Sequence, residues 1–270
     1  MAVQRTLTGL ILTAVILAGI FINPLTWILP VLFCAAALLG VHEYCNIASR
    51  REHPPLKWIS LIICAALLID ALRFGLGHFL EIAILAAILI GVAYVIFKDY
   101  VGSISGSAST MFANLYVTLP LALGILIFQM PHGRFIIGFI MGVVFMTDTG
   151  AYITGMKLGK HKLSPRLSPN KSIEGAIGGF LFGVITGLIA FAIMSAMKIE
   201  VLTLYEIIIL SAFFSVAGQI GDLVESGFKR DADVKDSGNT LSGHGGILDL
   251  TDGLIFCLPL MYVYLVIFPR

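Results

Sequence analysis

Charge is scarce in this sequence: Asp, Glu, Lys and Arg make up 12% of its 270 residues, whereas hydrophobic residues make up 58%. Apolar runs of about 20 residues recur throughout and the mean hydropathy is +0.98, which excludes an ordinary water-soluble domain. The alternation of polar and apolar residues typical of an outer-membrane β-barrel is also missing, and no soluble domain fits between the apolar runs. We therefore expect an all-α, polytopic integral membrane protein.

Several patterns that carry known chemistry are absent as well. The four cysteines have no C-x-x-C spacing, which favours buried thiols over disulfides or metal ligands. There is no Cys/His metal spacing, no Ser-His-Asp arrangement and no Walker-type phosphate loop. The sequence also lacks the repeats of a solenoid and the matched broken segments of an inverted-repeat transporter.

The apolar segments predict about nine membrane spans. They fall at residues 6–22, 25–40, 57–75, 79–97, 109–129, 135–156, 175–197, 203–226 and 247–268. The second is short and interrupted by proline, so eight and ten spans are alternatives. The first has one arginine before it and no small-residue cleavage site, so it is interpreted as a span and not as a signal peptide.

The distribution of Lys and Arg predicts the orientation. With the N-terminus inside, thirteen of the 17 basic residues fall on the inner side of the membrane. The other four fall on the outer side, and these are Arg73, Arg134, Lys198 and Arg270. This positive-inside bias places loops 157–174 and 227–246 in the cytoplasm, where soluble nucleotides are available.

The two halves of the chain differ in polarity. Residues 1–140 are mostly apolar and predict a transmembrane scaffold, whereas residues 141–270 hold the polar loops and predict the catalytic region. Asp70 is an exception in the first half. Because it lies one helical turn before Arg73, on the same face, we expect an ion pair between them in preference to a role with a substrate.

The most polar stretch is residues 222–252, which holds seven of the 16 acidic residues. Charge near a bilayer is costly and calls for a function. On a helix Asp222 and Glu225 share one side, and Asp249 and Asp252 do the same at the start of the last span. Two acidic helix ends can bring their oxygens to one hard divalent cation. Mg²⁺ fits because it binds one or two carboxylates together with phosphate and water, and two metal ions are an alternative.

Asp148 lies in the sixth predicted span, where an unpaired carboxylate would be costly. We expect it to meet a metal, a cation or a helix terminus, and an ion pair between two helices is the structural alternative. The loop that follows ends in Ser168, Asn170 and Lys171, directly before an apolar helix. The free N–H groups of that helix start, together with Lys171, predict an anion site. Glu174 in the first turn is interpreted as a helix cap.

Basic residues and glycines accompany the acidic stretch. Three cations supply fixed positive charge for phosphate oxygens, and these are Lys229, Arg230 and Lys235. Three glycines let the backbone approach a ligand closely, and these are Gly243, Gly245 and Gly246. His244, between them, has three open roles. It could act as a general acid, donate a hydrogen bond to a phosphate, or form a hydrogen bond that stabilises the turn.

These residues resemble the signature of the phosphatidate cytidylyltransferase family, also called CDP-diacylglycerol synthase. Twelve positions match it at the correct spacing, and these are Ser226, Lys229, Arg230, Lys235, Asp236, Gly238, Gly243, His244, Gly245, Gly246, Asp249 and Asp252. The segments 148–152 and 168–175 are also similar to that family. Two positions depart from it, since Ser242 replaces the usual proline and Leu250 the usual arginine.

The resemblance implies that CTP and phosphatidic acid react to give CDP-diacylglycerol and pyrophosphate. The candidate catalytic residues are Asp222, Asp249, Lys229, Arg230, Lys235 and His244. The candidate substrate-binding residues are Asp148, Ser168, Asn170, Lys171, Ser226, Asp236, Gly245 and Gly246. The candidate ligands of Mg²⁺, and of a second cation as an alternative, are Asp222, Asp249, Asp252 and Asp148. The resemblance further implies a homodimer in a bacterial cytoplasmic membrane, without nucleic acid among its partners.

Two alternative functions stay open. Another CTP-dependent lipid enzyme, such as a polyprenol kinase or a CDP-archaeol synthase, shares the chemistry but acts on a different lipid. An ion or phosphate transporter would use Asp148, Asp222 and Asp249 as a midplane site. The transporter fits less well, because these carboxylates cluster at predicted helix ends beside Lys-rich loops.

Overall fold

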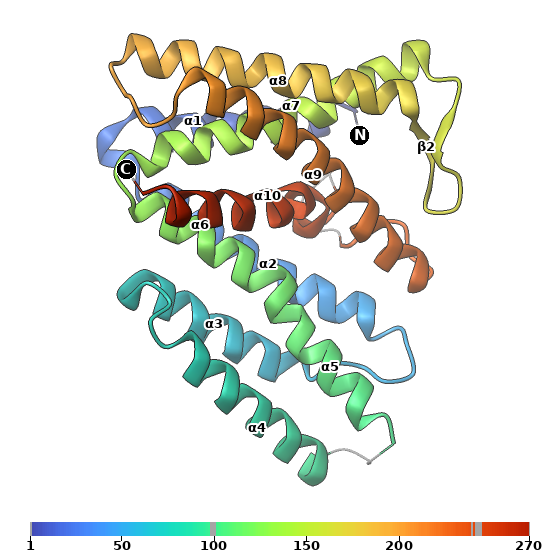
Figure 1. Cartoon of the computed structure of the whole chain (residues 1–270). Coiled ribbons are helices and arrows are strands. Elements are labelled where there is room, and N and C mark those ends of the chain that lie inside the picture. The colour runs from blue at the N-terminus through green and yellow to red at the C-terminus, as the bar shows by residue number, and fades with distance from the viewer. Residues whose placement is uncertain (1, 98–100, 239, 241–244, 270) are drawn as a thin grey trace. The chain divides into compact units, whose positions relative to one another are not determined.

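The computed structural model describes residues 2–97, 101–238, 240 and 245–269, and this part of the chain is almost entirely helical (Figure 1). The α-helices are α1 (Ala2–Phe21), α2 (Ile28–Ala48), α3 (Lys57–Phe74), α4 (Phe79–Phe97), α5 (Ser103–Ala113), α6 (Leu119–Gln129), α7 (Gly133–Leu158), α8 (Ile173–Ala196), α9 (Leu204–Asp231) and α10 (Ile247–Ile267). A 3₁₀ turn, η1 (Asn23–Leu25), precedes α2, and a π-helical turn, η2 (Asn114–Thr118), joins α5 to α6. Two short antiparallel strands, β1 (Lys162–Ser164) and β2 (Ser168–Ser172), form a hairpin between α7 and α8.

The expected all-α, polytopic membrane class is confirmed. Among the described residues, seven helical segments are long and apolar enough to cross a membrane. Helices α1 and α3 fall outside that set, so the count of nine spans stays a prediction. The hairpin was not expected, since residues 157–174 were predicted to form a loop.

The second span is longer than the sequence analysis predicted. It was expected to end near residue 40, but α2 continues to Ala48. Its prolines do not interrupt it, because Pro24 lies in η1 and Pro30 in the first turn of α2. A proline there removes an N–H that has no helical partner in any case. The extension matters because it places Glu43 on a helix.

The chain forms two compact units that are interleaved along the sequence. Unit 1 contains Met1–Val15, Trp27–Leu126 and Phe228–Thr251, and unit 2 contains Ile16–Thr26, Ile127–Gly227 and Asp252–Arg270. Both units therefore draw residues from both halves of the chain. The division of labour expected between residues 1–140 and 141–270 stays a prediction.

In unit 1, α2, α3, α4 and α5 pack against one another (Figure 1). Ile63 and Leu67 of α3 meet Ile90 and Tyr94 of α4 in a buried apolar cluster. The end of α9 joins this unit through an aromatic cluster. There Phe228 packs edge-on against Tyr44 of α2 and Tyr116 of η2, with ring centroids 6.1 and 5.2 Å away.

Asp70 has the structural role that was expected, but with a different partner. It is buried, with 3% of its surface exposed. Its carboxylate accepts the backbone N–H of His78 at 3.1 Å and contacts the His78 ring at 2.9 Å. The expected pairing with Arg73 was wrong, because the chain turns back after α3 at Gly75, in the left-handed conformation, and brings His78 over the carboxylate.

In unit 2, α7 and α8 lie side by side along most of their length (Figure 1). Their contact is close because α8 presents glycines to α7. A methyl group at Gly179 would come within 2.6 Å of the carbonyl oxygen of Thr147. Helix α9 joins the pair through Ser215, whose hydroxyl accepts a hydrogen bond from the Thr147 hydroxyl at 3.1 Å. Small side chains thus fix the backbone that carries the polar residues of this unit.

The start of α8 is organised differently from the prediction for Glu174. The helix cap is Ser172, whose hydroxyl oxygen accepts the N–H of Gly175 at 3.1 Å. Glu174 instead accepts the N–H groups of Lys160 and His161 at 3.0 and 3.2 Å. Its carboxylate therefore fastens the base of the β1–β2 hairpin to α8.

We expect Gly179→Ala to destabilise the protein, because the added methyl group meets backbone that cannot move aside cheaply. Overpacking of this kind costs about 1–3 kcal/mol. The matched control is Gly91→Ala on α4, where a methyl group has nothing within 4 Å and alanine favours the helix. Thermal unfolding of the detergent-solubilised protein measures both, and equal melting temperatures would contradict the packing argument.

Candidate functional site

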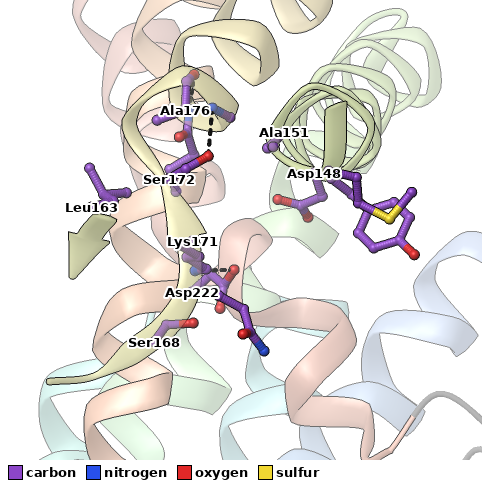
Figure 2. A pocket seen from close by; sticks show the side chains of 14 residues that line it. Asp148, Ala151, Leu163, Ser168, Lys171, Ser172, Ala176 and Asp222 are labelled. Carbon is purple, nitrogen blue, oxygen red and sulfur yellow. Dashed lines mark hydrogen bonds and ion pairs between the residues drawn. The ribbon is translucent and has the colours of Figure 1, made fainter. Parts of the chain in front are cut away.

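A cavity of about 610 Å³ opens in unit 2 between α7, the hairpin, α8 and α9. Its polar lining includes Asp148 on α7, Ser168, Asn170 and Lys171 on β2, and Asp222 on α9. Figure 2 shows the Asp148 carboxylate and the Lys171–Asp222 pair facing the same space. Five residues that the sequence analysis selected from three segments therefore line one cavity.

Lys171 and Asp222 form an ion pair inside this cavity (Figure 2). Their side chains are 27% and 31% exposed, so both remain open to a ligand. Gln219, one turn before Asp222, donates hydrogen bonds to the carbonyl oxygens of Ala176 and Ser215 at 3.3 and 3.0 Å. The bond to Ala176 ties α9 to α8 one turn before Asp222, whereas the bond to Ser215 lies within α9.

Three carboxylates of unit 2 gather beside the cavity. Asp222, Glu225 and Asp252 each offer an oxygen, and these oxygens lie within 4.8 Å of one another. Glu225 and Asp252 are buried, at 0% and 5% exposure. Gly221 makes the gathering possible, since a methyl group there would come within 2.6 Å of the carbonyl oxygen of Asp252. Glycine at this position lets α10 approach α9 closely enough for the three groups to meet.

The donor set fits a hard divalent cation. Ligand oxygens around Mg²⁺ lie about 2.1 Å from the metal, so adjacent oxygens are about 3 Å apart and opposite ones about 4 Å apart. The spacing within 4.8 Å among these carboxylates is close to that geometry. Three neighbouring negative charges also repel one another where water is scarce, and a shared cation relieves that repulsion. Asp222 belongs to both the carboxylate group and the cavity.

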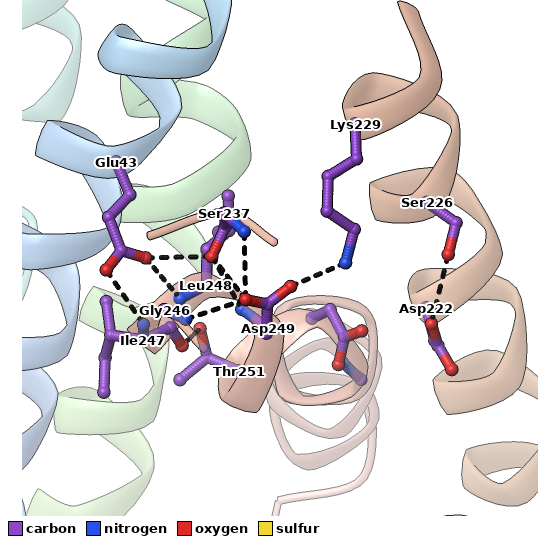
Figure 3. Close-up of polar contacts among 12 residues, drawn as sticks. Glu43, Asp222, Ser226, Lys229, Ser237, Gly246, Ile247, Leu248, Asp249 and Thr251 are labelled. Atoms are coloured by element: carbon purple, nitrogen blue, oxygen red, sulfur yellow. Dashed lines mark hydrogen bonds and ion pairs between the residues drawn. The ribbon is translucent and has the colours of Figure 1, made fainter. Parts of the chain in front are cut away.

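Unit 1 contains a second polar cluster, at the N-terminus of α10 (Figure 3). The ammonium group of Lys229 donates to Oδ1 of Asp249 at 2.6 Å, with side-chain exposures of 12% and 15%. The other carboxylate oxygen, Oδ2, accepts the N–H of Gly246 at 2.7 Å and the N–H and hydroxyl of Ser237 at 3.0 and 2.8 Å. Asp249 thereby ties the end of α9, loop 232–246 and the start of α10 together.

The remaining residues of the predicted site take different places. Ser226 donates from its hydroxyl to Asp222 at 3.4 Å. Gly245 has φ of 84°, in the left-handed region that glycine adopts without strain. Arg230, Lys235 and Asp236 are exposed on the surface. His244, Gly243 and Ser242 lie outside the described residues, and Leu250 is half-buried in α10.

The structure therefore brings together Asp148, Ser168, Asn170, Lys171 and Asp222, and separately Lys229, Gly246 and Asp249. Asp252 lies with Asp222 and Glu225, whereas Asp249 contacts Lys229 and the loop. The roles assigned to these residues stay predictions.

Two acidic residues were missed as candidates. Glu225 was recognised only as a neighbour of Asp222 on the helix, yet it completes the carboxylate group. Glu43 was not considered, since the second span was predicted to end at residue 40, but it lies on α2 and is 2% exposed. The available signal was an ionisable residue in a helical, membrane-level segment, which by itself indicates a function. For Glu43 this signal was missed because the second span was predicted to end at residue 40.

Comparisons with known proteins show the family to which this chain belongs. Residues 3–268 match the model of the cytidylyltransferase family. A phosphatidate cytidylyltransferase of Staphylococcus epidermidis is 36% identical over 273 residues, which is 97% of this chain and 98% of the relative. One of Staphylococcus aureus is 35% identical over 271 residues, with the same two shares of 97% and 98%. One of Bacillus subtilis is 40% identical over 126 residues, or 47% of this chain and 45% of the relative.

We expect Lys229→Met to lower stability by about 2–4 kcal/mol, because it leaves the half-buried carboxylate of Asp249 without its cation. Lys235→Met is the matched control, since that side chain is exposed, and it should leave the free energy of unfolding within about 0.5 kcal/mol of the wild-type value. Chemical or thermal unfolding in detergent measures the difference. Equal losses in the two variants would show that the ion pair contributes nothing specific.

Proposed function

Because the chain belongs to the cytidylyltransferase family, we propose that it transfers the cytidylyl group of CTP to phosphatidic acid. The products are CDP-diacylglycerol, a precursor in phospholipid biosynthesis, and pyrophosphate. The observation that carries this proposal is the cavity of unit 2, where Lys171 and Asp222 share one space with Asp148. Its volume of about 610 Å³ is in the usual range for a small-molecule site.

The reaction needs positioning and charge neutralisation more than proton transfer. The phosphate of the lipid is already an anion, so its oxygen can attack the α-phosphorus of CTP without a strong general base. A phosphorus–oxygen bond forms to the lipid phosphate, and the bond between the α-phosphorus and the bridging oxygen to the β-phosphate breaks. The electron pair leaves with pyrophosphate. Catalysis then rests on alignment and on stabilising the developing charge.

The residues of the cavity suit those two tasks. Lys171 supplies a cation for phosphate oxygens, and Ser168 and Asn170 supply neutral polar groups on the same strand. Asp222 holds the Lys171 ammonium in place before a ligand arrives. With Glu225 and Asp252, it would also hold Mg²⁺, which neutralises phosphate charge when bound. Asp148 and Asp249 as further ligands, and a second cation, remain proposals from the sequence pattern.

The membrane supplies the second substrate directly. The acyl chains of the lipid stay among the apolar helices while the headgroup reaches the polar cavity. Helices α8 and α9 are both long enough to cross the membrane, so the hairpin and loop 232–246 fall on the same side. Residues 159–172 of the hairpin segment hold four basic residues and no acidic one, which favours the cytoplasmic side, where CTP is found. A homodimer, implied by the family resemblance, is part of this proposal.

The rival functions make different demands on the same residues. A transporter needs an alternating path for an ion and no nucleotide, whereas the Lys171–Asp222 pair beside a carboxylate group suits a metal-bound polyphosphate. A CTP-dependent enzyme for a polyprenol or an archaeal lipid would keep the same charged groups and differ only in the apolar surroundings. The choice of lipid therefore has to be tested with lipids of each class.

We expect purified protein with Mg²⁺ to move label from [α-³²P]CTP into lipid when phosphatidic acid is present, with release of pyrophosphate. Asp222→Asn should lower kcat by at least about 100-fold, because it weakens both the cation site and the Lys171 pair. Asp233→Asn is the control, since Asp233 is exposed and has φ of 54°, which asparagine tolerates. Label in a polyprenol instead of phosphatidic acid would replace the proposed substrate. If no lipid of any class became labelled, the proposed enzymatic function would be refuted.

We expect Mg²⁺ to raise the melting temperature of the wild-type protein without any substrate, because a ligand that binds only the folded state stabilises it by about 2.7 kcal/mol at 100 times its dissociation constant. Asp252→Asn should lose most of this rise while remaining at least as stable without the metal, since it removes one of three mutually repelling carboxylates. Choline chloride at equal ionic strength is the control. An unchanged Mg²⁺ effect in Asp252→Asn would remove this residue from the cation site.

A further inference from the structure

Glu43 is a buried carboxylate in unit 1 that lies far from the acidic stretch in sequence. It belongs to α2 and is 2% exposed. Four donors surround it: the hydroxyls of Ser237 and Thr240 at 3.1 and 2.5 Å, and the N–H groups of Ile247 and Leu248 at 3.1 and 2.9 Å. All four belong to loop 232–246 or to the first turn of α10, and Figure 3 labels three of them, Ser237, Ile247 and Leu248. One side chain therefore contacts both the loop and the start of α10.

The two backbone contacts satisfy the start of α10. The first N–H groups of a helix have no partner within it, and a capping side chain normally comes from the residue just before the helix. Gly246 occupies that place and has no side chain to offer. Glu43 accepts the N–H groups of Ile247 and Leu248 instead. Its negative charge also suits the positive end of the helix dipole.

The loop is shaped around the Glu43 carboxylate. A methyl group at Gly246 would come within 2.3 Å of its Oε2, and one at Gly238 within 2.6 Å of its Oε1. Two of the glycines in the signature are therefore places where the loop backbone passes directly over Glu43. A larger residue at either position would have to displace either the Glu43 carboxylate or the loop backbone.

The contacts of Glu43 continue to Asp249 through a single hydroxyl. Ser237 Oγ lies 3.1 Å from Oε2 of Glu43 and 2.8 Å from Oδ2 of Asp249. Its one proton can be donated to either carboxylate, and its oxygen accepts the N–H of Asp249 at 3.3 Å. Lys229 then completes the line from the other side of Asp249. Displacing Glu43 would therefore alter the hydrogen bonds of Asp249 and, through them, the position of the Lys229 ammonium group.

Glutamate suits this position better than its amide would. An ionised carboxylate only accepts hydrogen bonds, and here four donors point at it. A glutamine would aim its own N–H₂ group at N–H and O–H donors, leaving at least one of them without an acceptor in a buried place. Such a loss costs about 1–3 kcal/mol. Size and position are almost unchanged by the substitution, so it tests the charge and the acceptors alone.

We propose that Glu43 is a positioning residue for the transfer reaction: it holds Ser237 and Thr240, from the loop after α9, against the start of α10 and so sets the place of Lys229 and Asp249. This inference rests on the proposed function for its kinetic consequence. Its structural part, the anchoring of the loop, does not depend on it.

The test compares Glu43→Gln with Glu52→Gln, the same change at an exposed glutamate of unit 1. In Glu43→Gln we expect kcat to fall about 10- to 100-fold, as for a reacting group displaced by a fraction of an ångström, with KM for phosphatidic acid changed less than about threefold. Amide hydrogen exchange at residues 246–249 should quicken at least about tenfold, while exchange in α3 and α4 stays as in the wild type. Glu52→Gln should match the wild type in both measurements.

A second pair of variants covers the outcome in which Glu43→Gln does not fold. Thr240→Ala removes one donor to Glu43, and Thr240→Ser keeps the hydroxyl, so the alanine variant should show lower kcat and faster exchange and the serine variant should restore both. Normal kcat with normal exchange in Glu43→Gln overturns the proposal. Faster exchange with an unchanged kcat overturns the positioning role and leaves Glu43 as a structural anchor. A wild-type protein without transferase activity refutes the proposed function, and the exchange measurement still decides whether Glu43 holds the loop.

Discussion

The structure depends on one constraint: a charged group in a strongly apolar chain needs fixed partners. Charged residues make up 12% of the sequence, and burying one without partners costs several kcal/mol. The protein meets this constraint with directed donors. Glu43 receives four of them, Asp249 receives an ammonium and three loop donors, and Asp70 receives His78. Each of these carboxylates is thereby held in one orientation, which is also what a catalytic site requires.

Close helix packing is the means by which these partners meet. Gly179 lets α8 lie against α7, and Gly221 lets α10 approach α9 at the level of Asp252. Without a side chain at Gly221, three carboxylates from two helices come within reach of one cation. In the same way, Gly238 and Gly246 let the loop pass over Glu43. Two glycines of the signature therefore act in unit 1 by making room for a buried carboxylate.

The sequence predicted a good part of the fold and of the site. The helical, membrane-spanning class follows from hydropathy alone, and most helices were placed within a few residues. Asp148, Lys171 and Asp222 were selected from separate segments because charge at membrane depth is costly, and they do line one cavity. The pairing of Asp70 was wrong, because a helical repeat cannot reveal that Gly75 turns the chain back and brings His78 over the carboxylate.

What the sequence by itself determined is which residues must find partners, since periodicity and hydropathy are local properties. It could not determine the partners. Glu43 and Ser237 are 194 residues apart, and no local pattern connects them. It also could not separate Asp249 from Asp252, because both lie on one face at the start of α10. Only the packing of other elements around that face decides that Asp249 contacts Lys229 and the loop, while Asp252 lies with Asp222 and Glu225. Partner choice is a matter of distance in space, and that is fixed only when the helices pack.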